Sequence, residues 1–130
     1  MNIAEIKNIL TPDALLEIFP SNTSDEFFDA LFGDASEGSY DIELGFCDVT
    51  ENVLTLELKL HERPGCCLAC NLTHGLPQVF SRHPIINVKG IVEKVNALLG
   101  NDITCGEWSL GSTQQQSRSL HTIPLRIALS

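Results

Sequence analysis

Residues 40–61 are YDIELGFCDVTENVLTLELKLH, and this stretch decides the fold. Apolar side chains occupy alternate positions on both sides of a central polar run; they are Tyr40, Ile42, Leu44 and Phe46, followed by Leu54, Leu56, Leu58 and Leu60. A period of two is typical of a strand with one buried and one solvent-exposed face. The polar residues 50–52 indicate a turn between the two runs. We therefore predict two antiparallel strands joined as a hairpin.

The chain before this hairpin predicts helices. Thr11 and Pro12 form a helix start, with the threonine as N-cap and the proline in the first turn. Thr23 gives a second start, because Glu26 follows it at the spacing of a capping box. Gly33 is well placed to end this second helix, since glycine adopts the left-handed C-cap conformation without strain. We expect these N-terminal helices to pack on the hairpin.

The chain after the hairpin predicts one long helix and two further strands. Pro84 opens the helix, whose apolar residues recur on one face, and Gly100 closes it. Residues 103–110 and 120–129 predict strands, with a polar turn between them. Pro124 has no N–H group to donate, so the last strand is expected at an edge of the sheet.

Together these elements predict an α+β fold. The expected architecture is a four-stranded antiparallel sheet made of two hairpins, with the N-terminal helices and one central helix packed on one face. We expect a single domain over residues 1–130, which is long enough to bury a core. Gly90 lies in the middle of the central helix, which it weakens, and it therefore indicates a close approach to another element.

The charge of the chain is unevenly distributed. Residues 1–62 carry 14 acidic and 2 basic side chains, a balance of −12. Residues 63–130 carry 3 acidic and 6 basic side chains, a balance of +3, and the two sums give the net charge of −9. We expect the basic half to dock on the acidic half. A chain of this charge repels the phosphate backbone, which disfavours nucleic-acid binding.

The sequence shows no targeting or membrane-spanning signal. No stretch approaches the ~18 consecutive apolar residues of a membrane span. The N-terminus lacks the basic head and apolar run of a signal peptide. We therefore expect a cytoplasmic protein with reduced thiols and without membrane contact.

A cysteine-rich loop at residues 63–84 holds the main chemical candidates. Glycine and proline recur through it, and it contains three of the five cysteines. Cys67 and Cys70 have the spacing of a zinc knuckle, in which two thiolates face one ion. A structural zinc ion needs four ligands. The candidates for the remaining positions are His74 and Cys105, with His83 as an alternate.

Two other interpretations of the cysteines stay open. A Cys-x-x-Cys pair can cycle between dithiol and disulfide, and a nearby Arg63, Arg82 or histidine would lower a thiol pKa. The segment lacks the βαβ setting of a thioredoxin-like motif, which weakens this redox alternative. Cysteine can also act as a small buried hydrophobic residue, which fits Cys47 and Cys105 in their predicted strands.

An anion site is also expected at the start of the central helix. Arg82 and His83 directly precede Pro84, where free N–H groups and the helix dipole favour a negative group. Arg63 is expected to lie near them. The competing expectation is a salt bridge from Arg82 to an acidic residue of the N-terminal half.

The cysteine segment resembles a small family of uncharacterised bacterial proteins. The resemblance rests on the run CLACNLTHGLPQVFSRHPIIN at residues 67–87 and extends to residues 32–35 and 105–108. Members carry a "pancreas/duodenum homeobox" label, yet this chain lacks the Trp-Phe-x-Asn-Arg pattern of a homeodomain recognition helix. The resemblance implies no established activity and no catalytic residues. In most members of the family a residue other than cysteine precedes the Cys-x-x-Cys, which argues against a role for Cys66 and favours Cys67 and Cys70 as the functional pair.

These observations favour a small protein without enzymatic activity of its own. Its Cys67/Cys70 loop is expected to bind a metal, with zinc as the first choice, or to form a binding surface. The alternative is a thiol–disulfide redox protein that uses the same two cysteines. A third hypothesis is a protein-interaction module with an unidentified protein partner, supported by the acidic N-terminal half and an exposed sheet edge. Homo-oligomerisation is left open.

Overall fold

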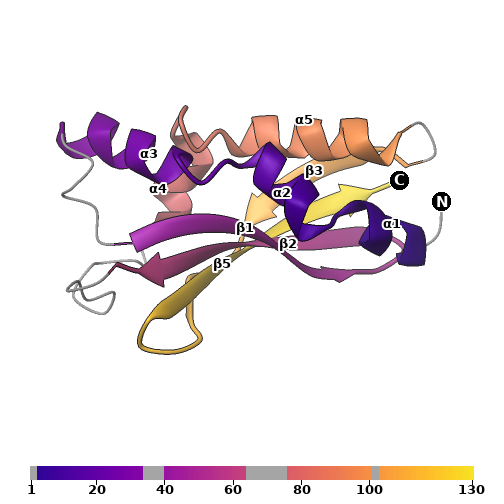
Figure 1. The fold of residues 1–130 in the computed structure, drawn as a ribbon. Helices are drawn as coiled ribbons and strands as arrows, with labels where there is room; N and C mark the ends of the chain where they lie inside the picture. The colour runs from indigo at the N-terminus through magenta and orange to yellow at the C-terminus, as the bar shows by residue number, and fades with distance from the viewer. Residues whose placement is uncertain (1–2, 34–39, 64–75, 101–102) are drawn as a thin grey trace.

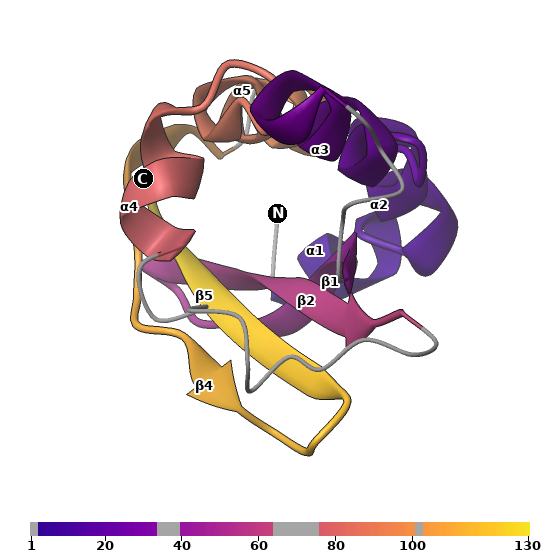
Figure 2. The ribbon, with the colours of Figure 1, turned by 90° about the vertical axis from the view of Figure 1, so that its left-hand side faces the viewer.

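The computed structural model describes residues 3–33, 40–63, 76–100 and 103–130, which form an antiparallel sheet covered by helices on one face (Figures 1 and 2). The strands follow the order β1-β2-β5-β3, and β4 also pairs with β5. The prediction of an α+β fold with an antiparallel sheet is confirmed. The elements are α1 (Ile3–Ile9), α2 (Pro12–Ile18), α3 (Thr23–Phe32), β1 (Tyr40–Val49), β2 (Val53–Glu62), α4 (Leu76–Arg82), α5 (Val88–Leu99), β3 (Cys105–Leu110), β4 (Gln114–Gln115) and β5 (Leu120–Leu129).

The sheet differs from the prediction in the number of strands and in the place of the last one. Five strands are present instead of four, because residues 114–115 pair with β5 where a polar turn was expected. The last strand, β5, is not at an edge, since it lies between β2 on one side and β3 and β4 on the other. The edge position expected from Pro124 was therefore wrong.

The pairing pattern explains how β5 tolerates a proline. The carbonyl of Pro124 accepts the N–H of Gly111 at 2.8 Å. The nitrogen and the oxygen of one strand residue point to the same side, so the proline nitrogen also faces β3 and β4. On that side of β5, Pro124 lies between two strand pairs. One joins Leu125 to Leu110 of β3, and the other joins Thr122 to Gln114 of β4. The missing donor thus falls at a break in the ladder.

The core lies between the helices and the covered face of the sheet. The alternation predicted for the hairpin is confirmed, because the even-numbered leucines of β2 are fully buried and their neighbours on that strand are only partly buried. Phenylalanines and a tyrosine from α3, α4 and β1 pack edge to face at one end of this core; they are Phe27, Phe28, Tyr40 and Phe80. None of the described helices is both long and apolar enough to cross a membrane.

The N-terminal helices begin and end largely as predicted. Thr11 is the N-cap of α2, and its hydroxyl accepts the N–H of Ala14 at 3.2 Å. Gly33 closes α3 in the left-handed conformation, with φ 78°. The capping box expected at Thr23 is wrong, because the N-cap of α3 is Asn22 and its side chain makes no capping hydrogen bond.

The second half of the chain contains an unexpected helix and a later helix start. The α4 helix lies within the segment expected to be a loop. The central helix, α5, begins at Val88 and not at Pro84, because the chain first turns and Asn87 then caps α5 by accepting the N–H of Gly90 at 3.2 Å. A Cβ on Gly90 would lie 2.8 Å from Cγ of Asn87. The close approach expected at Gly90 is thus to the cap of its own helix.

Candidate functional site at the Arg63 end of the sheet

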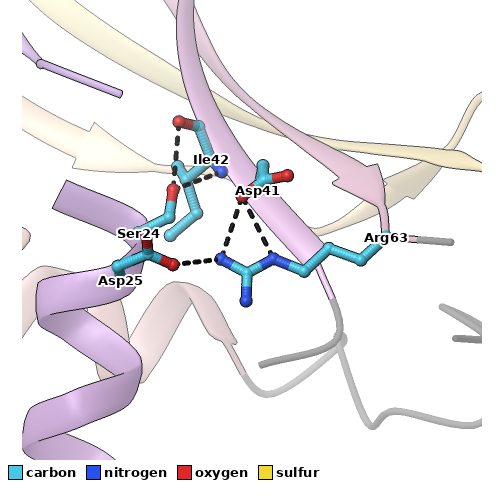
Figure 3. Close-up of polar contacts among 5 residues, drawn as sticks. All are labelled: Ser24, Asp25, Asp41, Ile42 and Arg63. Carbon is cyan, nitrogen blue, oxygen red and sulfur yellow. Dashed lines mark hydrogen bonds and ion pairs between the residues drawn. The ribbon is translucent and has the colours of Figure 1, made fainter. Parts of the chain in front are cut away.

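Arg63 holds together α3, β1 and the end of β2 (Figure 3). Its guanidinium donates to Oδ1 of Asp41 on β1, from Nε at 3.1 Å and from Nη2 at 2.9 Å. The same Nη2 lies 2.7 Å from Oδ1 of Asp25 on α3. The guanidinium carbon also stands 5.3 Å from the ring centre of Phe28, within range of a cation–π contact. We call the three charged residues the Arg63 clamp.

The Arg63 clamp is a contact between the basic and the acidic half of the chain, as their charges predicted. The side chain of Arg63 is 16% exposed, whereas both carboxylates are about 60% exposed. Burial alone would lower the pKa of Arg63, but the hydrogen bonds and charges of Asp41 and Asp25 outweigh it, and the pKa is raised. The arginine therefore stays charged, and the acidic half of the chain supplies its counterions. An anion bound by Arg63, as predicted, would have to compete with these two carboxylates.

Ser24 fixes α3 against β1 next to the clamp (Figure 3). Its hydroxyl oxygen accepts the N–H of Ile42 at 2.7 Å and lies 3.4 Å from the carbonyl oxygen of the same residue. Ser24 is completely buried and Ile42 nearly so. The serine thereby satisfies two backbone groups at the outer edge of β1 that would otherwise be buried without partners.

Both flanks of the cysteine segment rest on α3. Residues 64–75, which include Cys67, Cys70 and His74, lie outside the described part of the chain. The preceding residue, Arg63, contacts Asp25 and Phe28, as described above. The helix that follows the segment, α4, packs Phe80 against Phe27 with ring centres 5.4 Å apart. Arg63 and Phe80, on either side of residues 64–75, thus both contact the same turn of α3.

His83, the alternate zinc ligand, lies at this same end. Its ring centre is 4.8 Å from that of Phe27, in an edge-to-face contact. Its Nδ1 lies 3.2 Å from the backbone nitrogen of Ile85 and accepts that N–H. The proton of the neutral ring is then on Nε2. Metal ligation through Nε2 would require this hydrogen bond to break, because a ligating histidine carries its proton on the other nitrogen.

Cys105, the other candidate ligand, lies far from the Arg63 clamp. It pairs with Leu129 of β5, whereas His61, just before the clamp, pairs with Leu120. Nine positions of extended strand, from 120 to 129, correspond to roughly 30 Å. The structure therefore places Cys105 at the opposite end of the sheet from Arg63. Burial raises the pKa of its half-buried thiol.

Cys47 is not buried, contrary to the prediction made from its position in a strand. It is exposed, because the pairing of β1 with β2 shifts between Phe46 and Asp48 and leaves the cysteine as the extra residue of a bulge. Desolvation, followed by the charges of Glu57 and Asp48, raises the pKa of the Cys47 thiol, and Arg126 opposes the rise. A raised thiol pKa makes this cysteine a poor nucleophile near neutral pH.

Arg82 and His83 do not directly precede a helix in the structure. Arg82 is the last residue of α4, and five residues separate it from the start of α5 at Val88. A basic residue at a helix C-terminus complements the negative end of the dipole. The salt bridge to the acidic half is made by Arg63, and among the described residues no carboxylate pairs with Arg82. An anion site around Arg82 stays a prediction.

His121 was missed by the sequence reasoning. It is 3% exposed and pairs across the sheet with Leu60, so it occupies a core-facing position at the Arg63 end. The signal was present, since His121 shares the parity of Ile123 and Leu125 in the alternation of the last strand. His61, by contrast, is exposed on the solvent face of the sheet, where its Nε2 lies 3.2 Å from Oε1 of Glu43.

Neither the described geometry nor comparison identifies a known site. The part of the chain that the structure describes contains no group of three or more His, Cys, Asp or Glu side chains that could hold a metal ion. Models of known protein families, curated proteins and solved structures all gave no match to this chain.

Proposed function

We propose that this is a non-catalytic, cytoplasmic binding protein whose segment 64–75 holds a zinc ion through Cys67 and Cys70. The spacing of these two cysteines supports a thiolate half-site. His74 follows at a short distance along the chain and supplies the third ligand of the proposal. The fourth position goes to His83 or Cys105, or to a water molecule or a bound group.

The observation that carries this proposal is the anchoring of both flanks on α3. Arg63 is fixed by two carboxylates, and α4 is fixed by Phe80 against Phe27. Tethered ends reduce the number of conformations open to the intervening chain, so less entropy is lost when its ligands gather around an ion. Metal binding and local folding would then be coupled.

The positions of the two candidates for the fourth zinc ligand favour His83 over Cys105. His83 contacts α3 at the Arg63 end, whereas Cys105 belongs to the opposite end of β5. Ligation by His83 would require its Nδ1 to release the N–H of Ile85. Cobalt substitution separates the two ligands, because the intensity of the thiolate-to-cobalt band reflects the number of coordinating cysteines. His83→Ala would leave that band in place and shift the ligand-field bands, while Cys105→Ala would leave both unchanged.

Metal analysis of protein purified without added metal or chelator tests the proposal. We expect about one zinc ion per chain, lost on substitution of either cysteine of the pair. Cys66→Ser and Cys47→Ser are matched controls and should retain the ion. A folded, metal-free protein would contradict the proposal. If that metal-free protein also formed a Cys67–Cys70 disulfide in a glutathione buffer, the redox alternative would replace the zinc proposal.

A further inference from the structure

The strand β3 forms one edge of the sheet, and β1 forms the opposite edge. The two edges differ in their exposure to solvent. At β1 the outward N–H of Ile42 is already bonded to Ser24, and Leu44 is only 4% exposed. Every residue of β3, by contrast, is partly or fully exposed. Of the two edges in the described part of the chain, β3 is therefore the accessible one.

Two residues of β3 direct their backbone groups away from the sheet. The N–H of Gly111, just after the strand, donates to the carbonyl of Pro124, so Gly111 faces β5. Because backbone direction alternates along a strand, Ser109 also faces β5, whereas Trp108 and Leu110 face outward. Among the described residues, no group outside the sheet hydrogen-bonds to either of these two. The edge is thus open from Trp108 to Leu110.

This open edge is complementary to itself. When two copies pair antiparallel about Ser109, Trp108 of each copy lies opposite Leu110 of the other. Both residues face outward, so each such pair exchanges two N–H···O=C bonds. Their side chains are only partly buried against the core of one copy, and the pairing covers them further. A twofold axis at Ser109 uses the same surface on both copies, as in most homodimers.

The same register brings opposite charges together on the solvent face of the sheet. Glu107 and Arg126 are exposed, and neither makes a salt bridge with a described residue. Pairing about Ser109 places Glu107 opposite Gly111 of the other copy. Since Gly111 has no side chain, Nη1 of Arg126 lies in that space, 2.9 Å from where a Cβ would be. The carboxylate of one copy thus meets the guanidinium of the other, and the twofold axis repeats the contact.

The distribution of charge along the sheet also favours a second copy at this edge. Residues 103–130, which form β3, β4 and β5, carry one acidic and two basic side chains. The strands β1 and β2 belong to the acidic half of the chain and lie on the other side of β5. Pairing through β3 therefore joins the less acidic edges and keeps the acidic edges of the two copies apart.

We propose that the protein forms a symmetric homodimer, in which β3 pairs antiparallel with β3 of a second copy about Ser109 and the two sheets become one. Contacts between Trp108 and Leu110 form the helix side of this interface. Ion pairs between Glu107 and Arg126 form its solvent side. The interface is defined without the proposed zinc segment, so either proposal can fail without the other.

Sedimentation equilibrium and tryptophan fluorescence of the wild-type protein test the proposal. We expect a monomer–dimer equilibrium between micromolar and millimolar protein. Trp108 is the only tryptophan, so its emission should shift to longer wavelength on dilution as the indole becomes more exposed to water. Amide exchange at Trp108 and Leu110 should quicken at the same time. A chain that stays monomeric at millimolar protein, as expected if β3 serves a strand of another protein, overturns the proposal. A dimer whose formation leaves the Trp108 emission unchanged does so as well.

Charge reversal tests the register of the pairing. Glu107→Arg and Arg126→Glu each place like charges opposite each other in a homodimer, so each should weaken dimerisation by roughly tenfold or more. In an equimolar mixture of the two variants, both contacts are again between opposite charges, and a heterodimer should form. The matched controls are Glu93→Arg on α5 and Arg118→Glu, two exposed residues outside the interface, which should dimerise like the wild type. The proposal is overturned if the interface variants dimerise as well as these controls, or if their mixture stays monomeric. Circular dichroism checks that each variant is folded, and the wild-type measurements decide if one is not.

Discussion

The substitution Ser24→Ala tests how α3 is attached to the sheet. It removes the hydroxyl that accepts the N–H of Ile42 at 2.7 Å, in a position from which water is excluded. A buried donor left without an acceptor costs about 1–3 kcal/mol, and we take ~2 kcal/mol as the central value. Alanine is the better helix former by ~0.5 kcal/mol, which offsets part of the loss. The free energy of unfolding should therefore fall by about 1.5 kcal/mol.

This loss converts into a measurable change in melting temperature. Unfolding entropy amounts to ~2.1 cal/mol/K per residue, or about 0.27 kcal/mol/K for a chain of 130 residues. A loss of about 1.5 kcal/mol then lowers Tm by roughly 5 °C. Urea unfolding followed by circular dichroism should show a lower midpoint with an unchanged m-value, because the surface exposed on unfolding stays the same.

A second serine provides the control. Ser81 on α4 donates to the carbonyl of Gln78 at 3.0 Å in a solvent-exposed hydrogen bond. Water can replace that bond, so Ser81→Ala should change stability by less than ~0.5 kcal/mol. Amide exchange at Ile42 should quicken only in the Ser24 variant. Equal stability of the two variants, with Ile42 exchange unchanged, would refute the role given to Ser24.

Two further predictions concern a buried phenol and two glycines. Burial raises the pKa of Tyr40, the only tyrosine of the chain, so its contribution to stability is complete below the unfolded-state pKa of ~10 and is lost as the pH rises above it. Tyrosinate absorbance should rise together with alkaline unfolding, and a rise near pH ~10 in folded protein would contradict this. A Cβ at Gly111 would lie 2.6 Å from the ring carbon Cγ of Pro124, so Gly111→Ala should destabilise the protein by ~1–3 kcal/mol in urea unfolding. At Gly45 the nearest atom is the flexible Cε of Lys59 at 2.7 Å, so Gly45→Ala should cost under ~1 kcal/mol, and equal losses for both glycines would contradict the steric argument.

Several features of the candidate site could not be predicted from the sequence because they join residues far apart along the chain. Nothing in the local pattern distinguishes Arg63, which pairs with Asp25 and Asp41, from Arg82, which pairs with no described carboxylate. The total charge of each half predicts attraction between the halves, but not which arginine makes the contact. Likewise, the sequence marks Ser24 only as a residue typical of a helix start. The packing of α3 on β1 is what turns its hydroxyl toward Ile42.

The sequence alone determined the features that depend only on residues close together along the chain. The alternating residues of the hairpin predicted both strands and their buried face, because side-chain direction in a strand depends only on position along the chain. Thr11 and Gly33 predicted their caps, since a cap is a contact within one turn. Only the tertiary structure decided the strand order, because pairing partners are chosen by which apolar faces can be covered together. It therefore placed Pro124 inside the sheet and put Cys105 at the opposite end of β5 from Arg63.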